Sequence, residues 1–317
     1  MAPPKRIFFA TDVHGSEACF FKFLNAWKPY KADIMILGGD LSGKALAPIV
    51  DRGDGFFESS FLGIEQVQPL KDVAGFEDRV RRTGLYPLRM DKETYAELSE
   101  DKTKLESLFE RLIRERIEGW VSLAEEKLRG AKAEFYISGG NDDPLFVDDL
   151  LRKSHVFTDS EKEVVTLSGG NEMITLSWVN PTPWRTPREM EEGKLEKMIN
   201  ELASNLRSTN SSIFNLHAPP RDSGLDQVQK LDDELKPVFE GGQPVMVSAG
   251  SNAVARVIEL FKPMLGFHGH IHESRGAAKI GRTLCINPGS EYSETILRGV
   301  VVDVEDGHVK SHIFTSG

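Results

Sequence analysis

Short runs of apolar residues, each ending in a polar loop, recur five times along the chain. The runs are Ile7–Ala10, Ile34–Leu37, Phe135–Ile137, Ile213–Leu216 and Met264–Phe267. Apolar runs of this length, bounded by glycine, proline or charged residues, are typical of buried strands. In open α/β sheets, ligands bind beyond the carboxyl ends of the strands. We therefore expect the loops that follow these runs to meet at one edge of the fold.

The stretch from residue 45 to 130 has a different pattern. Residues 51–75 mix glycine, aspartate and phenylalanine with weak periodicity, which predicts a loop with little regular structure. From 91 to 129, apolar residues recur at three- and four-residue steps, which predicts helix ending near Gly130. We interpret 45–130 as an inserted loop and helical segment beside the site. The alternative is a plain crossover helix after a long loop.

Two pairs of apolar runs in the C-terminal half predict β-hairpins. Val164–Leu167 and Met173–Trp178 flank a Ser-Gly-Gly-Asn turn, and Val300–Val304 and Val309–Phe314 flank an Asp-Gly turn. Strand–loop units of parallel type followed by hairpins predict an α/β fold with a mixed sheet, or with two sheets packed together.

The composition is that of a globular protein. The chain has 317 residues, of which 39% are hydrophobic and 28% charged, and this excludes disordered and fibrous classes. The formal charge of −10 argues against a nucleic-acid partner. Cys19 and Cys285 are too few for a disulfide framework or a cysteine-rich zinc site. The first apolar run is too short for a signal sequence or a membrane span. We expect a cytoplasmic protein without membrane contact. The sequence leaves open whether the chain forms a homo-oligomer.

The loops after the apolar runs carry a set of oxygen and nitrogen donors. The set is Asp12, His14, Asp40, Asn141, His217, His270 and His272. Carboxylate, amide and imidazole donors without thiolate suit two divalent metal ions, namely Mn²⁺, Fe²⁺, Ni²⁺ or Zn²⁺. On extended backbone, His270-x-His272 would project both rings to one side, and Asp12-x-His14 has the same spacing. A single carboxylate, for which Asp40 is our candidate, could bridge metals about 3.5–4 Å apart.

The order D-x-H, G-G-D, G-N, H-x-P-P and G-H-x-H resembles the calcineurin-like metallophosphoesterase superfamily. Within it, Gly39–Lys44, His268–Ser274 and Asn287–Ser290 are similar to the small Icc-like phosphoesterases. The resemblance runs from Asp12 to about Ser290, interrupted by the insertion. It implies two mixed β-sheets packed face to face with helices outside, a four-layer sandwich.

The resemblance also implies roles for the donors and a reaction. Residues 1–44 and 131–317 would form the metallophosphoesterase catalytic domain. One metal would be bound by Asp12, His14 and His272, the second by Asn141, His217 and His270, with Asp40 bridging. The expected reaction is hydrolysis of a phosphomonoester or phosphodiester, by in-line attack of a hydroxide that bridges the metals. The expected substrate is a small phosphate ester. A nuclease and a catalytically idle interaction module with this fold are the alternatives.

One position departs from the superfamily pattern. Asp142 follows Asn141 where the superfamily commonly has a histidine that protonates the departing oxygen. Two nearby cations would lower the pKa of the Asp142 carboxyl, which would make it a poor general acid at neutral pH. We therefore expect efficient turnover only for leaving groups that need little protonation, unless another group supplies the proton. His268 is a candidate donor, with a structural role in the core as its alternative.

Several basic residues near these motifs are candidate phosphate contacts. Lys44 ends a stretch one residue short of a phosphate-binding loop, because the next residue offers no hydroxyl for Mg²⁺. We discount nucleotide binding of that type and keep Lys44 as a residue that could attract a substrate phosphate. Arg185, Arg188 and Arg221 are candidate phosphate clamps on fold analogy alone. The rigid segment 180–184 either lines a substrate pocket or packs its tryptophan against the core.

Overall fold

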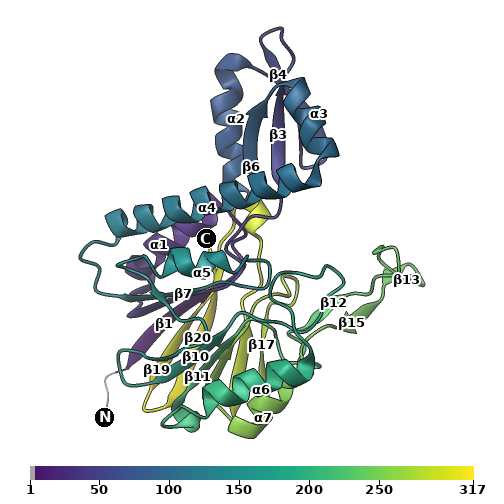
Figure 1. The fold of residues 1–317 in the computed structure, drawn as a ribbon. Coiled ribbons are helices and arrows are strands. Elements are labelled where there is room, and N and C mark those ends of the chain that lie inside the picture. The colour runs from purple at the N-terminus through teal and green to yellow at the C-terminus, as the bar shows by residue number, and fades with distance from the viewer. Residues whose placement is uncertain (1–3) are drawn as a thin grey trace.

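Residues 4–317 are described in the computed structural model, where two six-stranded sheets pack between layers of helices (Figure 1). The first sheet has the order β20-β19-β1-β2-β7-β8, formed by His308–Ser316, Arg298–Glu305, Lys5–Ala10, Ile34–Gly38, Glu134–Ser138 and Thr158–Asp159. The second has the order β17-β18-β16-β11-β10-β9, formed by Gly276–Ile280, Thr283–Asn287, Leu265–Phe267, Ile213–Leu216, Glu172–Leu176 and Val164–Thr166. Both sheets are mixed. In the first, β1, β2 and β7 are parallel, and in the second, β10, β11 and β16 are parallel.

The alternation of side chains along a strand divides the first sheet between two cores. Phe8 and Met35 point toward the outer helices, whereas Phe9 and Ile36 point toward the second sheet. Phe9 stacks on Phe267 of β16, with ring centroids 4.3 Å apart. The two sheets therefore pack face to face, and the predicted α/β fold class is confirmed.

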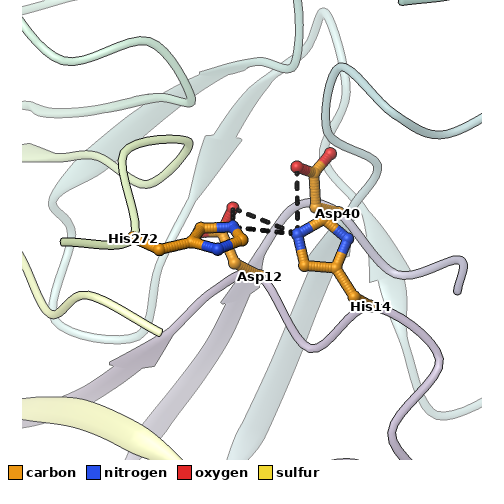
Figure 2. A group of neighbouring side chains, drawn as sticks. All are labelled: Asp12, His14, Asp40 and His272. Atoms are coloured by element: carbon orange, nitrogen blue, oxygen red, sulfur yellow. Dashed lines mark hydrogen bonds and ion pairs between the residues drawn. The ribbon is translucent and has the colours of Figure 1, made fainter. Parts of the chain in front are cut away.

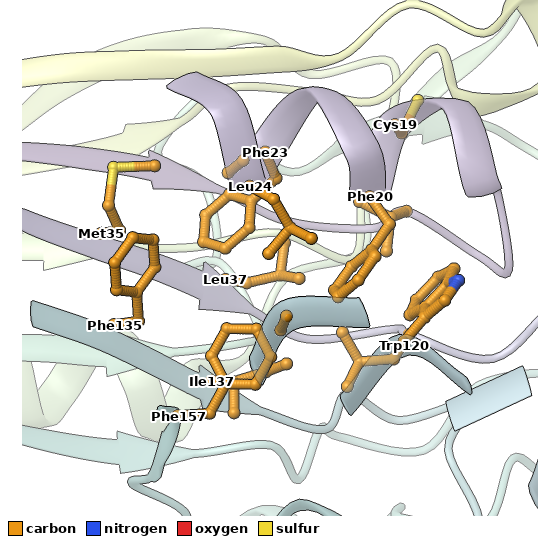
Figure 3. Packing of buried hydrophobic residues seen from close by; sticks show 14 of the residues in the cluster. Cys19, Phe20, Phe23, Leu24, Met35, Leu37, Trp120, Phe135, Ile137 and Phe157 are labelled. Atoms are coloured by element: carbon orange, nitrogen blue, oxygen red, sulfur yellow. The ribbon is translucent and has the colours of Figure 1, made fainter. Parts of the chain in front are cut away.

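Helices cover the outer face of each sheet. The first sheet is covered by α1 (Glu17–Tyr30), α4 (Lys102–Lys127) and α5 (Phe146–Leu151), and the second by α6 (Glu192–Ala203) and α7 (Asn252–Phe261). Figure 3 shows Phe20 of α1 stacked on Trp120 of α4, with ring centroids 4.1 Å apart. The apolar stripe predicted over 91–129 is thus core contact along much of α4.

The inserted segment contains a sheet that the sequence pattern did not predict. Its strand order is β5-β4-β3-β6, formed by Ile64–Pro69, Phe56–Phe61, Leu46–Asp51 and Tyr86–Met90, and it carries helices α2 (Leu70–Arg82) and α3 (Lys92–Glu100). The loop predicted over 51–75 is therefore wrong. Along β4, Phe56 is exposed and Ser59 is buried, which obscures the alternation expected of a strand. The division into a catalytic domain and an insertion stays a prediction.

Both predicted hairpins are present, as β9–β10 and β19–β20. A further arm projects from the body between residues 227 and 248 (Figure 1). It contains β12 (Gln227–Gln229) paired with β15 (Met246–Ser248), and β13 (Phe239–Glu240) paired with β14 (Gln243–Pro244). Over residues 4–317, every helix is too short or too polar to cross a membrane.

Candidate metal centre

The loops that follow the parallel strands meet at one edge of the two sheets. The loops after β1 and β2 remain hydrogen-bonded beyond the strands themselves. The backbone N–H of Asp12 donates to Gly39 O at 2.9 Å, and that of His14 donates to Asp40 O at 2.8 Å. This extension of the strand pairing places the D-x-H and G-G-D loops side by side.

Four of the seven candidate ligands have strained backbone. Positive φ angles are found at Asp12 (54°), His14 (39°), Asp40 (47°) and His270 (65°). Left-handed backbone costs a non-glycine residue about 1–3 kcal/mol and persists only where surrounding contacts enforce it. The extended backbone predicted for Asp12-x-His14 and His270-x-His272 is therefore wrong, because left-handed turns bring these side chains to the centre.

One group of donors gathers around Asp12 and His14 (Figure 2). The Nε2 atoms of His14 and His272 lie 3.0 Å apart. His14 Nε2 is 3.5 Å from Asp40 Oδ2, and His272 Nε2 is 3.3 Å from Asp12 Oδ1. One ligand atom from each of these four residues lies within 4.8 Å of the others, so the group could hold a metal ion.

A second group shares Asp40 with the first. It consists of Asp40, His217 and His270, whose ligand atoms also lie within 4.8 Å of one another. His217 Nε2 is 3.3 Å from Asp40 Oδ2. The structure thus brings together six of the seven predicted donors in two groups joined by one carboxylate.

The seventh donor, Asn141, lies on the loop after β7 and is oriented by its amide nitrogen. Asn141 Nδ2 donates to Asp142 Oδ1 at 2.9 Å and to Thr186 Oγ1 at 3.0 Å. Asn141 Oδ1 is buried and has no hydrogen-bond partner among residues 4–317. His217 is oriented by its Nδ1, which lies 3.2 Å from Gly38 O, so that its buried Nε2 faces Asp40 Oδ2. A buried acceptor without a partner is costly, and a cation would satisfy Asn141 Oδ1.

Backbone donors orient the two carboxylates. The N–H of His270 donates to Asp12 Oδ1 at 3.1 Å, and the N–H of Asp142 donates to Asp40 Oδ1 at 2.9 Å. The other carboxylate oxygen of Asp40, Oδ2, faces His14 and His217. Hydrogen bonds of this kind hold metal ligands in place. The donor set and its supports therefore fit divalent metal ions.

Burial and mutual charge set the protonation of these groups in the metal-free chain. Burial lowers the pKa of His270 to about 3 and that of His14 well below its usual value. Burial also opposes the charged form of His217, but Asp40 and Asp12 outweigh it and raise the pKa of His217 to about 9. His14 and His270 are therefore neutral at pH 7, as metal ligands must be, whereas His217 would release a proton to a cation.

Asp143 connects the loops, and the sequence analysis did not single it out. Its fully buried carboxylate accepts hydrogen bonds from Leu41 N, Ser42 N, Ser42 Oγ and Gly140 N, at 2.6–2.9 Å. It thereby ties the loop that holds Asp40 to the loop that holds Asn141. A single acidic residue after Asn141-Asp142 has no sequence signal that would separate this role from a surface position.

Two of the hypotheses about the neighbouring segments are wrong. Arg188 is fully buried and pairs with Asp148 at 2.8 Å, so it cannot clamp a substrate phosphate. It also donates to the backbone oxygen of Asp143 at 2.8 Å, which supports the loop beneath the centre. Trp184 is 64% exposed, which excludes packing against the core. Arg185 and Arg221 are exposed, and their clamp role stays a prediction.

Asp142 and His268, the two candidates for proton transfer, have different surroundings. The Lys44 ammonium lies 3.0 Å from Asp142 Oδ2, beside the donor groups. Burial and the neighbouring Asp40 raise the pKa of Asp142 in the metal-free chain. His268 Nδ1 lies 2.9 Å from Leu216 O and 3.0 Å from Ala218 O, and burial lowers its pKa to about 4. Only His268 Nε2 is left for another contact. A role of His268 as proton donor to the leaving group stays a prediction.

Comparison with known proteins adds evidence on the fold. No family model matches the chain. A segment of 111 residues, 34% of the chain, is 33% identical to an uncharacterized protein of Methanocaldococcus jannaschii and covers 44% of that protein. The chain thus matches less than half of this relative's length, and the relative's name states no activity.

Among solved structures, a crystal structure of a Thermus thermophilus protein has a TM-score of 0.54, covers 99% of both chains and is 12% identical. This likeness shows a shared fold. An archaeal phosphodiesterase has a TM-score of 0.24 at 14% identity, covering 62% of this chain and 91% of its own, and it supports no conclusion here.

Proposed function

We propose that this chain is a metal-dependent phosphoesterase of the metallophosphoesterase superfamily, in its Icc-like group. The observation that carries the proposal is the pair of donor groups that share Asp40. The unpartnered Oδ1 of Asn141 beside them supports it. The donors are all oxygen and nitrogen, which suits Mn²⁺, Fe²⁺, Ni²⁺ or Zn²⁺. The reaction would be hydrolysis of a small phosphomonoester or phosphodiester by in-line attack.

The residues would divide their work between two metal ions. Asp12, His14 and His272 would hold one ion, Asn141, His217 and His270 the other, and Asp40 would hold both. Bound divalent ions supply Lewis acidity, which activates water at neutral pH and neutralises phosphate oxygens. The strained, hydrogen-bonded loops hold these side chains in one geometry before substrate arrives, which removes much of the cost of ordering.

The decisive experiment combines metal analysis with turnover. Protein reconstituted with Mn²⁺ should contain two metal ions per chain and hydrolyse p-nitrophenyl phosphate or bis-p-nitrophenyl phosphate. Asp40→Asn removes the shared carboxylate and should lower both metal content and turnover, the latter by at least about a hundredfold. Asp306→Asn, on the turn between β19 and β20, is the matched control and should change neither. Failure of the wild type to retain metal would overturn the proposal.

Asp142 leads to a more specific expectation about the leaving group. Because a carboxylate beside two cations is a poor proton donor, activated aryl esters should be hydrolysed much faster than alkyl esters. Asp142→His should narrow this ratio by accelerating the alkyl ester. An unchanged ratio would contradict the assignment of Asp142 to the leaving-group side.

The presence of Asp142 in place of the usual histidine also favours a second candidate function, a catalytically idle interaction module. Two bound metals without turnover on a panel of phosphate esters, cyclic nucleotides included, would support that candidate. Cleavage of single-stranded DNA or RNA alone would instead support a nuclease. We further propose a cytoplasmic location, because Cys19 and Cys285 are both buried free thiols.

A further inference from the structure

We propose that Lys44 binds a phosphoryl oxygen of the substrate, and that Asp142 holds its ammonium in position for this contact. The proposal rests on the phosphoesterase function proposed above and adds to it a phosphate-binding residue outside the metal-ligand set. The juxtaposition that carries it is a partly exposed lysine whose ammonium and neighbouring backbone are both held beside the candidate metal centre.

The side chain of Lys44 is held by a carboxylate that is itself fixed. Asp142 Oδ2 lies 3.0 Å from Lys44 Nζ, while Asp142 Oδ1 accepts from Asn141 Nδ2 at 2.9 Å. The backbone N–H of Asp142 donates to Asp40 Oδ1 at 2.9 Å. Asp142 therefore cannot move without disturbing two candidate metal ligands, and the lysine is placed relative to the metal centre.

The backbone beside Lys44 is held from the opposite side. Gly43 N donates to Tyr86 Oη at 3.0 Å, and a Cβ on Gly43 would lie 2.0 Å from Gly84 O. The chain enters β3 two residues after Lys44. Lys44 thus lies at the junction of the Asp40 loop and the inserted sheet, with little freedom in its backbone.

The side chain of Lys44 nevertheless remains partly accessible. The Lys44 side chain is 45% exposed, whereas that of Asp142 is 20% exposed. Asp142 Oδ2 is 3.8 Å from His14 Nδ1, which places the lysine pair against the first donor group. An ammonium has three N–H donors, so Lys44 can keep its bond to Asp142 and still donate to a phosphate.

A simple surface ion pair is the alternative explanation. Such a pair contributes little to stability, and its removal would leave phosphate binding unchanged. A charge-assisted hydrogen bond to phosphate is worth about 1.5–3 kcal/mol, which corresponds to a roughly 10- to 150-fold change in affinity. The two explanations therefore differ in a measurable quantity.

The test is calorimetric binding of inorganic phosphate to the full chain loaded with Mn²⁺. Lys44→Met should weaken phosphate binding at least about tenfold while Mn²⁺ content and thermal stability stay as in the wild type. Lys44→Arg should restore most of the affinity, because it keeps the charge and the donors. Lys279→Met, which removes an exposed lysine on β17, is the matched control for loss of one charge.

The outcomes separate this inference from the proposed function. If the wild type hydrolyses phosphate esters and Lys44→Met binds phosphate as tightly as the wild type, only the role of Lys44 is overturned. If Lys279→Met weakens binding as much as Lys44→Met, the effect is one of net charge and the role is likewise overturned. If the metal-loaded wild type neither hydrolyses esters nor binds phosphate, the proposed function is overturned first.

Discussion

The candidate metal centre and the β3–β6 sheet of the predicted insertion are stabilised in opposite ways. At the centre, buried polar side chains and left-handed backbone are held by hydrogen bonds between distant loops, with Asp143 accepting four of them. In the insertion, α2 packs Val73, Phe76 and Val80 on its own sheet in a small apolar core. The candidate centre therefore depends on contacts between distant loops, whereas the small core under α2 is local.

The two regions nevertheless meet at a few contacts. A Cβ on Gly84 would lie 2.2 Å from His14 O, and the buried guanidinium of Arg116 on α4 donates to Gly15 O. A cleft of about 820 Å³ is lined by residues of α1, α2 and α4. The insertion thus adjoins the centre through its α2–β6 turn, and changes in its core should reach the centre only weakly.

The largest effect is expected from Asp143→Asn. An amide offers a single acceptor oxygen, so at least two of the four donors would lose their partner, at a cost of about 3–5 kcal/mol. Urea unfolding should show this loss, and calorimetry should show that Mn²⁺ no longer binds. Asp149→Asn, an exposed change on α5, should have neither effect. Retained Mn²⁺ binding in Asp143→Asn would mean that the loops do not need this support.

Phe76→Ala should destabilise the insertion by about 3–4 kcal/mol without disturbing the centre. Phe76 is fully buried and packs edge-on against Phe61, with ring centroids 5.7 Å apart. Hydrogen exchange should accelerate in β3–β6, while Mn²⁺ affinity stays within about threefold of the wild type. Leu70→Ala, at a position that is 59% exposed, is the control. Loss of Mn²⁺ binding would show that the two regions fold as one unit.

Glu161→Gln should remove a pH dependence from the free energy of unfolding. Burial, opposed by Arg188 and Ser177, raises the pKa of Glu161 to about 7. The folded chain then binds this proton more tightly than the unfolded chain, so the stabilisation is complete below about pH 4.3 and is lost as the pH rises through 7. The difference in unfolding free energy between variant and wild type should change by about 3 kcal/mol between pH 4.3 and 8. Glu163→Gln, at an exposed site, should track the wild type.

Tyr86→Phe should have the smallest effect, because it removes a single contact between the regions. Gly43 N would lose its acceptor, at a cost of about 1–2 kcal/mol. Urea unfolding measures the cost, and Mn²⁺ affinity should be unchanged. Combining the change with Phe76→Ala should lower the free energy of unfolding by less than the sum of the two single losses, because a sheet loosened by Phe76→Ala holds Tyr86 less firmly against Gly43. Full additivity would contradict this coupling.

Much of the fold and most of the donor set could be predicted from the sequence by itself, because both are written in local patterns. The buried strands are short apolar runs, the hairpins have turn residues between such runs, and the donors follow the strands directly. Six of the seven donors therefore fall into the two groups that the structure assembles, with Asn141 beside them.

Tertiary structure alone decided the features that depend on distant partners. Leu41 and Asp143 are 102 residues apart, so no local pattern connects the two loops that they join. The burial of Arg188, the anchoring of Lys44 by Asp142 and the left-handed backbone of His270 are likewise imposed by neighbours remote in sequence. The sheet of the predicted insertion escaped prediction because exposed Phe56 and buried Ser59 obscure the apolar alternation of β4, whose Phe57 and Phe61 pack against α2.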